Sequence, residues 1–169
     1  MDTKFAVALH ILTMISEETS KLSSQTLANS VGTNASYIRK ILALLKNSGI
    51  ITSHQGKTGY QLTRLPEQIS LLTIYLAIQE SDHIHLFAVH QNANPKCPVG
   101  KYIESAMRPL FADIEVQLAE ALRRQTLKDV IDNLYYISQQ KKDSRREKNL
   151  YNYLIRKELS DVSCTPYSI

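Results

Sequence analysis

The sequence predicts a mainly α-helical protein with one small β-hairpin. Three observations lead to this fold class. Several stretches place apolar residues at three- and four-residue steps, the periodicity of a helix with one buried face. Two short runs rich in β-branched residues flank a glycine-containing turn between residues 50 and 63. After Cys97 a much longer stretch returns to the helical period.

A helix and then a shorter second helix are expected at the start of the chain. The first covers residues 3–17, and its buried face consists of Phe5, Ala8, Leu9, Leu12 and Ile15. Ser23 or Ser24 can cap a second helix over residues 25–31, because a serine hydroxyl accepts a hydrogen bond from a free N–H of the first turn. Gly32 ends this helix.

Asn34 can cap a third helix over residues 35–47, which Gly49 ends. Its inner face consists of Ile38, Ile41, Leu42 and Leu45. The polar side chains Tyr37, Arg39 and Lys40 lie largely on the other side, with Ser36 near the helix start.

A hairpin follows, with strands over residues 50–54 and 60–63 around a turn at 55–59. Pro66 ends this unit. Ser70 caps a fourth helix over residues 71–79, which is apolar on several sides and is therefore expected to be buried between two parts of the protein.

A loop-like segment covers residues 81–96, and its middle, 84–89, can form a short strand. A long helix is then expected over 98–124, and Pro109 should kink it or separate two helices. Its apolar seam consists of Val99, Ile103, Met107, Leu110, Ile114, Leu118, Ala121 and Leu122. Thr126 caps a last helix over 127–138.

Length and composition limit the class of protein. A chain of 169 residues can bury a core of its own. Two cysteines, Cys97 and Cys164, are too few for a disulfide framework. No stretch reaches the roughly 18 apolar residues of a membrane helix, and no secretory signal is apparent. A cytoplasmic location is expected.

Charge is distributed unevenly along the chain. Residues 19–66 hold six Lys or Arg and no Asp or Glu, whereas residues 67–140 hold six basic and nine acidic side chains. A long basic segment without acids is typical of a surface that binds a polyanion. The alternative is a solvated face on which lysines gather by chance.

Two short helices at a sharp turn, followed by a hairpin, describe a winged helix-turn-helix. A helix fits the major groove of B-DNA, where the exposed residues of its first half reach the base edges. A basic hairpin tip reaches the neighbouring backbone or minor groove. The charge pattern therefore favours DNA binding over a three-helix packing module with a surface hairpin.

Residues 36–51 and 56–71 resemble the Rrf2 (Rrf-two) family of bacterial winged-helix transcriptional regulators, and residues 94–100 resemble a subgroup of that family. The resemblance covers roughly residues 1–139. The family usually has two adjacent glycines before the aromatic residue of the wing, and Thr58 replaces the first of them here.

The resemblance implies a homodimer that reads double-stranded DNA at a pseudo-palindromic operator. The implied DNA-binding residues are Gln25, Thr26, Asn34, Ser36, Tyr37, Arg39, Lys40, Lys46, Gln55, Lys57 and Thr58. Among them Arg39 is a candidate guanine reader, and Tyr37 is as suited to bracing the helix. The implied dimer interface is the long helix, through Ile103, Met107, Leu110, Ile114 and Leu118.

Several members of the family hold an iron–sulfur cluster on three cysteines, but this chain has only Cys97 in that region. Because such a cluster needs several thiolates, no cofactor is expected. His83, His85, His90 and Cys97 are of residue types that suit zinc, but their spacing is not diagnostic, and no metal site is expected.

Cys97 stands at the expected start of the long helix, between Lys96 and Lys101. Amide dipoles and positive charge favour a thiolate there, which makes Cys97 a candidate sensor of oxidants or electrophiles. We expect it at the junction between the dimer unit and the DNA-binding unit. The alternatives are a structural residue, or a small ligand held between the dimer helices as the signal.

The sequence thus predicts a DNA-binding domain over residues 1–81, a loop and dimerisation helices over 82–139, and a basic extension over 140–169. The extension can pack as an amphipathic helix or contact DNA. The expected function is sequence-specific regulation of transcription, as a homodimeric repressor that responds to a redox or small-molecule signal. No catalytic motif indicates an enzyme. The alternative is an adaptor whose winged unit binds protein.

Overall fold

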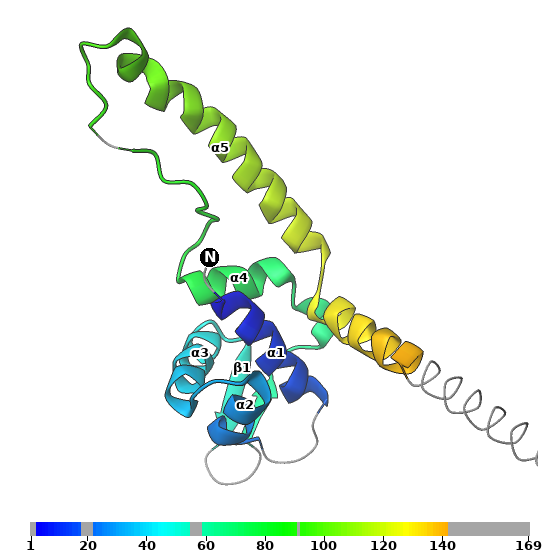
Figure 1. Ribbon diagram of the computed structural model, residues 1–169. Helices are drawn as coiled ribbons and strands as arrows, with labels where there is room; N and C mark the ends of the chain where they lie inside the picture. Colours follow the sequence, from blue (N-terminus) through cyan, green and yellow to red (C-terminus); the bar gives the residue numbers. More distant parts are fainter. Residues whose placement is uncertain (1–2, 18–21, 55–58, 91, 142–169) are drawn as a thin grey trace, which may run out of the picture. The chain divides into compact units, whose positions relative to one another are not determined.

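The computed structural model describes residues 3–17, 22–54, 59–90 and 92–141. They fall into two compact units, divided between Val130 and Ile131. Figure 1 shows the first unit as a helical bundle with a hairpin, from which a long loop and a long helix extend. Within these residues, no helix has the length and apolar character needed to cross a membrane. The mainly α-helical class with a small hairpin is confirmed.

Three helices form the start of the first unit: α1 over Lys4–Glu17, α2 over Ser24–Val31 and α3 over Ala35–Asn47. Ser23 is the residue that caps α2, and its hydroxyl accepts a hydrogen bond from the N–H of Thr26 at 3.0 Å. Gly32 ends α2 in the left-handed conformation, with φ of 76°, which a residue with a Cβ adopts with difficulty. This sharp end turns the chain directly into α3.

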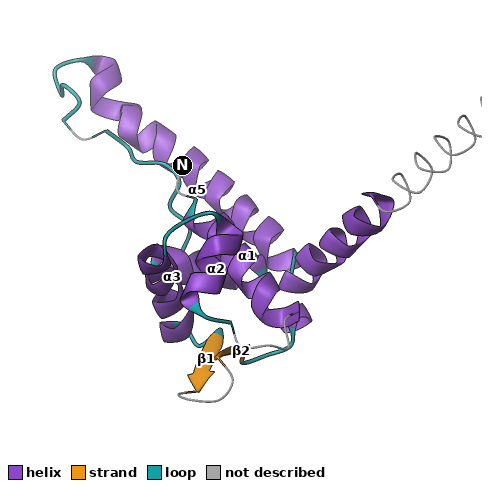
Figure 2. Cartoon of the chain, turned by 60° about the horizontal axis from the view of Figure 1, so that its bottom comes forward, coloured by secondary structure: helices purple, strands orange, loops and turns teal. Residues whose placement is uncertain are grey.

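The hairpin consists of β1 over Ile51–His54 and β2 over Gly59–Leu62, paired antiparallel with Ile51 opposite Leu62. Figure 2 shows it at the edge of the helical bundle. Thr63 joins the strands to the end of α3, because its hydroxyl donates to the Gly49 carbonyl at 2.6 Å. The predicted turn at 55–59 lies, except for Gly59, outside the described residues.

The core of this unit is built from isoleucine and leucine side chains of the helices, of β1 and of the residues that flank these elements. The fully buried ones include Ile11, Leu12, Leu27, Ile38, Ile41, Leu45, Ile50, Ile51, Ile69, Ile74 and Ile78. All four predicted inner residues of α3 are buried. This packing orients α3, so that its opposite face is directed to solvent.

A short 3-10 turn over Pro66–Gln68 leads into α4, Leu71–Gln79, which Ser70 caps as predicted. The helix packs against α1, α3 and α5, which explains its apolar character on several sides. The chain after α5 returns to this place, because the N–H of Leu71 donates to the Gln125 carbonyl at 2.8 Å and the N–H of Leu127 to the Ile69 carbonyl at 2.9 Å.

The long helix α5 covers Pro98–Arg124, a span of 27 residues, and continues through Pro109. Of the two effects expected of Pro109, a kink or a separation into two helices, the separation is therefore wrong. Exposed helix tolerates an interior proline where the turns on either side keep their own hydrogen bonds, at a cost of about 3 kcal/mol. Figure 1 shows α5 as one continuous ribbon.

The predicted strand at 84–89 is also wrong, since this described stretch is irregular. Its backbone hydrogen-bonds to a side chain and not to a neighbouring strand, because the N–H of Leu86 donates to Oε1 of Glu115 at 2.7 Å. Phe87 stacks on Phe111 of α5, with 4.6 Å between the ring centroids. The loop thus packs along α5.

Thr126 begins the last described helix, which covers residues 127–141 and is longer than predicted. Its cap is reciprocal: the Thr126 hydroxyl accepts from the N–H of Asp129 at 3.4 Å, and the Asp129 carboxylate accepts from the N–H of Thr126 at 2.7 Å. The N–H of Thr126, and after it the Thr126 hydroxyl that lies 2.8 Å from the same carboxylate oxygen, lower the pKa of Asp129. Residues 142–169 lie outside the described part. They hold Cys164 and all of the predicted extension except Gln140 and Lys141.

Glu80 ends α4 in a left-handed conformation with φ of 52°, which is strained for a residue with a Cβ. Glu80→Gly is expected to raise the free energy of unfolding by about 0.5–1 kcal/mol, because glycine adopts this conformation without strain. Thermal denaturation checks this. Glu80→Ala is the matched control, since it removes the same carboxylate but keeps the Cβ. Equal stability of the two variants would contradict the account.

Candidate nucleic-acid interface

The solvent face of α3 carries basic and uncharged side chains. Ser36, Arg39 and Lys40 are exposed on this face, opposite the buried Ile38, Ile41, Leu42 and Leu45. The helix lacks acidic residues altogether. The structure therefore brings together, on one helix, the central residues of the DNA-binding set that the sequence predicts.

Arg39 has a neighbour on the preceding helix. Its Nε lies 3.5 Å from the hydroxyl of Ser24 in α2, which is a long hydrogen bond. This contact uses Nε alone, and the residue is otherwise exposed to solvent. Lys46 is also exposed, in the last turn of α3, where its charge complements the helix dipole.

Asn34 and Tyr37 are partly committed to the fold. The Oδ1 atom of Asn34 accepts a hydrogen bond from the N–H of Tyr37 at 2.8 Å, which caps α3. The side-chain amide N–H groups of Asn34 are the part that can donate to a ligand. Tyr37 is half-buried, which agrees with its alternative role as a brace for the helix.

The start of α2 presents Gln25 and Thr26, both exposed. Gln25 donates to Oδ1 of Asn29 at 2.9 Å, and the Thr26 hydroxyl lies 2.9 Å from that of Ser23. The N-terminus of a helix carries free N–H groups and a positive dipole end, which suit a phosphate. Gln55, Lys57 and Thr58 of the predicted wing tip lie outside the described residues.

Two further residues belong to the same face of α3, and sequence reasoning missed them. Ala43 and Asn47 are exposed, and they follow Ser36 by seven and eleven residues, which places them on its side of the helix. The spacing itself was the signal. A small residue such as Ala43 in the middle of the face lets the helix approach a surface closely.

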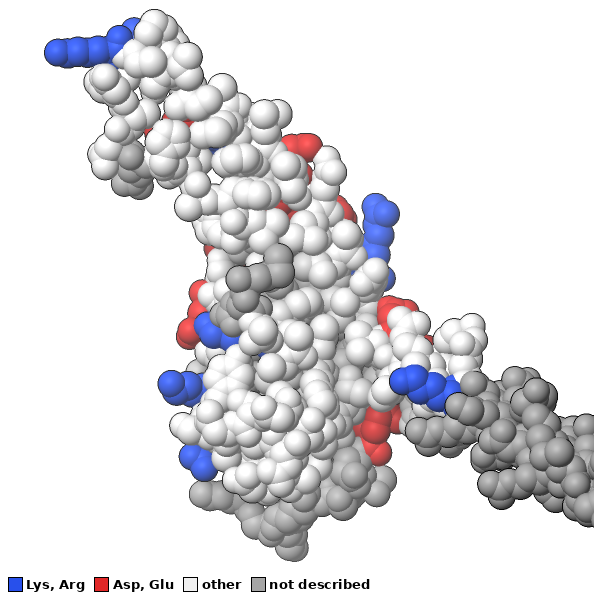
Figure 3. Space-filling model, viewed as in Figure 1, with Lys and Arg blue, Asp and Glu red and all other residues white. Residues whose placement is uncertain are grey.

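Figure 3 shows Lys and Arg side chains along one side of the helical bundle, with most Asp and Glu side chains elsewhere in that view. All the charged residues in the segment from Thr19 to Pro66 are Lys or Arg. The charge of the unit thus agrees with its predicted attraction to a polyanion.

One side of α5 carries the predicted seam. Leu110 is 65% exposed, Ile114 45% and Val99 67%, while Ile103, Met107 and Leu118 are half-buried. None of the residues of α5 is buried. An apolar face of this extent on a long helix marks an interaction surface.

Cys97 is exposed and stands directly before α5. The N–H groups of Gly100 and then Val99 lower the pKa of its thiol, because they stabilise the thiolate. The turn before the helix packs closely, since a Cβ on Gly100 would lie 2.4 Å from the carbonyl oxygen of Asn94.

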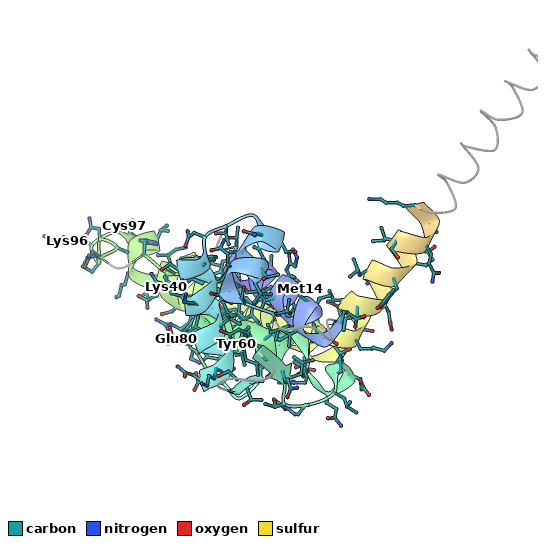
Figure 4. All side chains as sticks on the ribbon, turned by 90° about the horizontal axis from the view of Figure 1, so that it is seen from below. Met14, Lys40, Tyr60, Glu80, Lys96 and Cys97 are labelled. Atoms are coloured by element: carbon teal, nitrogen blue, oxygen red, sulfur yellow. The ribbon has the colours of Figure 1, made fainter. Side chains whose placement is uncertain are left out.

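Cys97 is expected from the sequence at the junction with the DNA-binding unit. In the single chain it does not lie at that junction. The junction, where Gln125 and Leu127 bond to residues before and in α4, is at the other end of α5. At 1.5 Å per residue, that helix is roughly 40 Å long. Figure 4 shows Cys97 next to Lys96, where the loop meets the start of α5, at the edge of the molecule in that view.

The comparisons with known proteins agree with this geometry. A family model described as Rrf2, iron-dependent transcriptional regulator, matches residues 1–133. YwnA of Bacillus subtilis (strain 168), named as an HTH-type transcriptional regulator, is 42% identical over 135 residues, which are 80% of this chain and 99% of YwnA.

Solved structures give the same result. The crystal structure of a transcriptional regulator from Lactobacillus plantarum is 27% identical, with a TM-score of 0.65 over 85% of this chain and 99% of that one. The structure of CymR, the global cysteine regulator of B. subtilis, has a TM-score of 0.58 at 22% identity, over 78% of this chain and 95% of CymR. That second likeness concerns the fold alone.

The iron in the family description does not fit the donor set of this chain. An iron–sulfur cluster needs several thiolates, and the whole sequence has two cysteines, Cys97 and Cys164. Among the described residues, His, Cys, Asp and Glu side chains form no group of three or more suited to a metal. No step of the mechanism is therefore assigned to iron.

The fold, the basic solvent face of α3, the family model over residues 1–133 and the relation to YwnA agree with one another. The chain belongs to the Rrf2 family of DNA-binding transcriptional regulators.

Proposed function

We propose that the chain acts as a homodimeric repressor that reads a pseudo-palindromic operator, with α3 of each copy in a major groove. The observation that carries this proposal is the exposed, acid-free face of α3 with Ser36, Arg39 and Lys40. Two equivalent helices require two equivalent half-sites, so the symmetry of the dimer sets the symmetry of the operator.

The residues of the interface take different roles. Arg39 contacts a guanine, because its free terminal nitrogens suit the paired acceptors of that base. Asn34, Ser36 and Tyr37 lie beside it at the start of α3. Lys40 and Lys46 bind phosphates, as do Gln25 and Thr26 at the start of α2. Gln55, Lys57 and Thr58 of the wing contact the neighbouring backbone.

The dimer forms through the seam of α5, which consists of Ile103, Met107, Leu110, Ile114 and Leu118. At 100° per residue these five positions fall within about 80° of the helix circumference. Packing this stripe against its twin removes exposed leucine and isoleucine surface from water. Pairing also fixes the distance between the two recognition helices.

The signal enters through Cys97. Val99, two residues further on, lies on the seam side of α5 and is exposed, so a modified thiol acts on the dimer contact at this end of the helix. A change there can switch DNA binding only if it affects the bound and free conformations differently. The alternative signal is a small ligand.

Reactivity of the thiol is open to a direct measurement. In a Cys164→Ser background, the alkylation rate of Cys97 by iodoacetamide is expected to rise with pH to a midpoint below about 8.5, the ordinary thiol pKa. The sign follows from the lowered pKa, which leaves more thiolate at neutral pH. A midpoint at or above that value would reject the activated thiol. A second measurement compares operator binding before and after peroxide in the Cys164→Ser protein and in the same protein with Cys97→Ser added. If both lose operator binding equally, Cys97 has a structural role and is not the sensor.

The proposed function is tested by selecting bound genomic fragments and titrating their affinity against salt. With about six phosphate contacts, affinity is expected to fall by about a thousandfold between about 50 and about 200 mM salt. A protein-binding adaptor would select no common sequence and would show no such steep dependence. That outcome would reject the repressor hypothesis in favour of the protein-binding adaptor.

A further inference from the structure

A cavity of about 330 Å³ lies between α4, the loop after it and α5, on the first unit. Its floor is apolar and is contributed by Leu72, Leu76, Ile84, Ala112, Val116 and Ala119. Asp82, His83, Glu115 and Arg123 complete the lining. The volume and the mainly apolar lining with a few polar groups are typical of a small-molecule site.

The charges around this cavity are not balanced. Arg123 is paired with Glu120 one turn before it, so its charge is already compensated. The N–H of Leu86, and after it that of Phe87, lower the pKa of Glu115 by bonding to its Oε1 atom. The Asp82 carboxylate, bonded to the His83 ring, also has a lowered pKa. Glu115 therefore stands as an ionised carboxylate beside the apolar floor, and the carboxylate of Asp82, whose side chain is 93% exposed, lies at the open edge of the cavity.

We propose that this cavity binds a small organic cation with an apolar body, such as a primary amine that carries a phenyl or short alkyl group. The apolar body occupies the floor between Leu72, Leu76 and Val116. The ammonium group lies at the carboxylates of Glu115 and Asp82. An anion of the same shape is disfavoured by both carboxylates.

The site is separate from the proposed dimer interface. Ala112, Val116, Ala119 and Arg123 recur at three- and four-residue steps, and at 100° per residue their side of α5 is about 160° from the seam of Met107 and Ile114. A second copy of the chain on the seam thus leaves the cavity open. The inference goes beyond the proposed function and does not depend on DNA binding.

Three ligands with a similar apolar body test the proposal on the full chain by isothermal titration calorimetry: 2-phenylethylamine, 2-phenylethanol and 3-phenylpropionate. The amine is expected to bind with a dissociation constant on the order of 1 mM or tighter, which is reasonable for a ligand of this size. It should bind about fivefold more tightly than the alcohol, and the carboxylate should bind least. Absence of amine binding, or equal binding of all three, would overturn the proposal.

Variants locate the site. Ala119→Leu fills the cavity and should abolish amine binding, whereas Ala106→Leu, on an exposed position of α5 outside the lining, should preserve it. Glu115→Gln keeps an oxygen that can accept from Leu86 but removes the charge. It should weaken amine binding about fivefold and leave the alcohol unchanged. Amine binding that survives Ala119→Leu would place the ligand elsewhere and reject the assignment.

Discussion

Leu110→Asp is expected to convert the protein from a dimer into a monomer at micromolar concentration. Leu110 is 65% exposed in the single chain and lies near the middle of the proposed seam. In the dimer an aspartate there would lose its water without a partner in both copies, at a cost of several kcal/mol. The dimer dissociation constant should rise by at least about a hundredfold, and operator affinity should fall, because one half-site contact replaces two.

Because Leu110 is exposed in the single chain, the substitution should leave the fold of the monomer intact. A loss of the dimer can therefore be distinguished from unfolding. Ser105→Asp is the matched control: it adds the same charge to an exposed position of α5, on the side away from the seam. Sedimentation velocity measures the assembly, and circular dichroism the helix content. An unmodified protein that sediments as a monomer would refute the dimer, as would a Leu110→Asp protein that stays dimeric.

The sequence predicts the helical bundle closely because each boundary has a local cause. Ser23, Asn34 and Ser70 cap the helices whose starts they predict, and Gly32 ends α2 in the left-handed conformation. The inner face of α3 follows from the spacing of its apolar residues alone, and so does the solvent side that holds Arg39. Signals of this kind do not depend on tertiary context.

The errors arise where distant parts of the chain decide the structure. Residues 84–89 have strand-like composition, but the Glu115 carboxylate of α5 takes the N–H groups of Leu86 and Phe87. No local pattern reveals a partner almost thirty residues away. The place of Cys97 was missed for a similar reason, since only the hydrogen bonds of Gln125 and Leu127 show which end of α5 joins the bundle.

Arg39→Ala is expected to weaken binding to the selected operator by about 1–3 kcal/mol per half-site and to relax the preference at one base position in each. The physical reason is the loss of two parallel hydrogen bonds from the guanidinium to a guanine. The residue can be removed without unfolding the chain, because it is exposed and the one hydrogen bond of its side chain within the described residues is the long one to Ser24. Fluorescence anisotropy on the operator and on base-substituted duplexes measures both effects.

The matched control is Arg39→Lys, which keeps the charge but cannot present two nitrogens in a rigid fork. If Arg39 reads a base, the lysine variant should keep the salt dependence of the unmodified protein and still lose the preference at the same position. If Arg39 only neutralises a phosphate, Arg39→Lys should bind like the unmodified protein, and Arg39→Ala should weaken all sequences alike while flattening the salt dependence. That second pattern would move base reading from Arg39 to the other exposed residues of α3, with Ser36 and Lys40 the next to test.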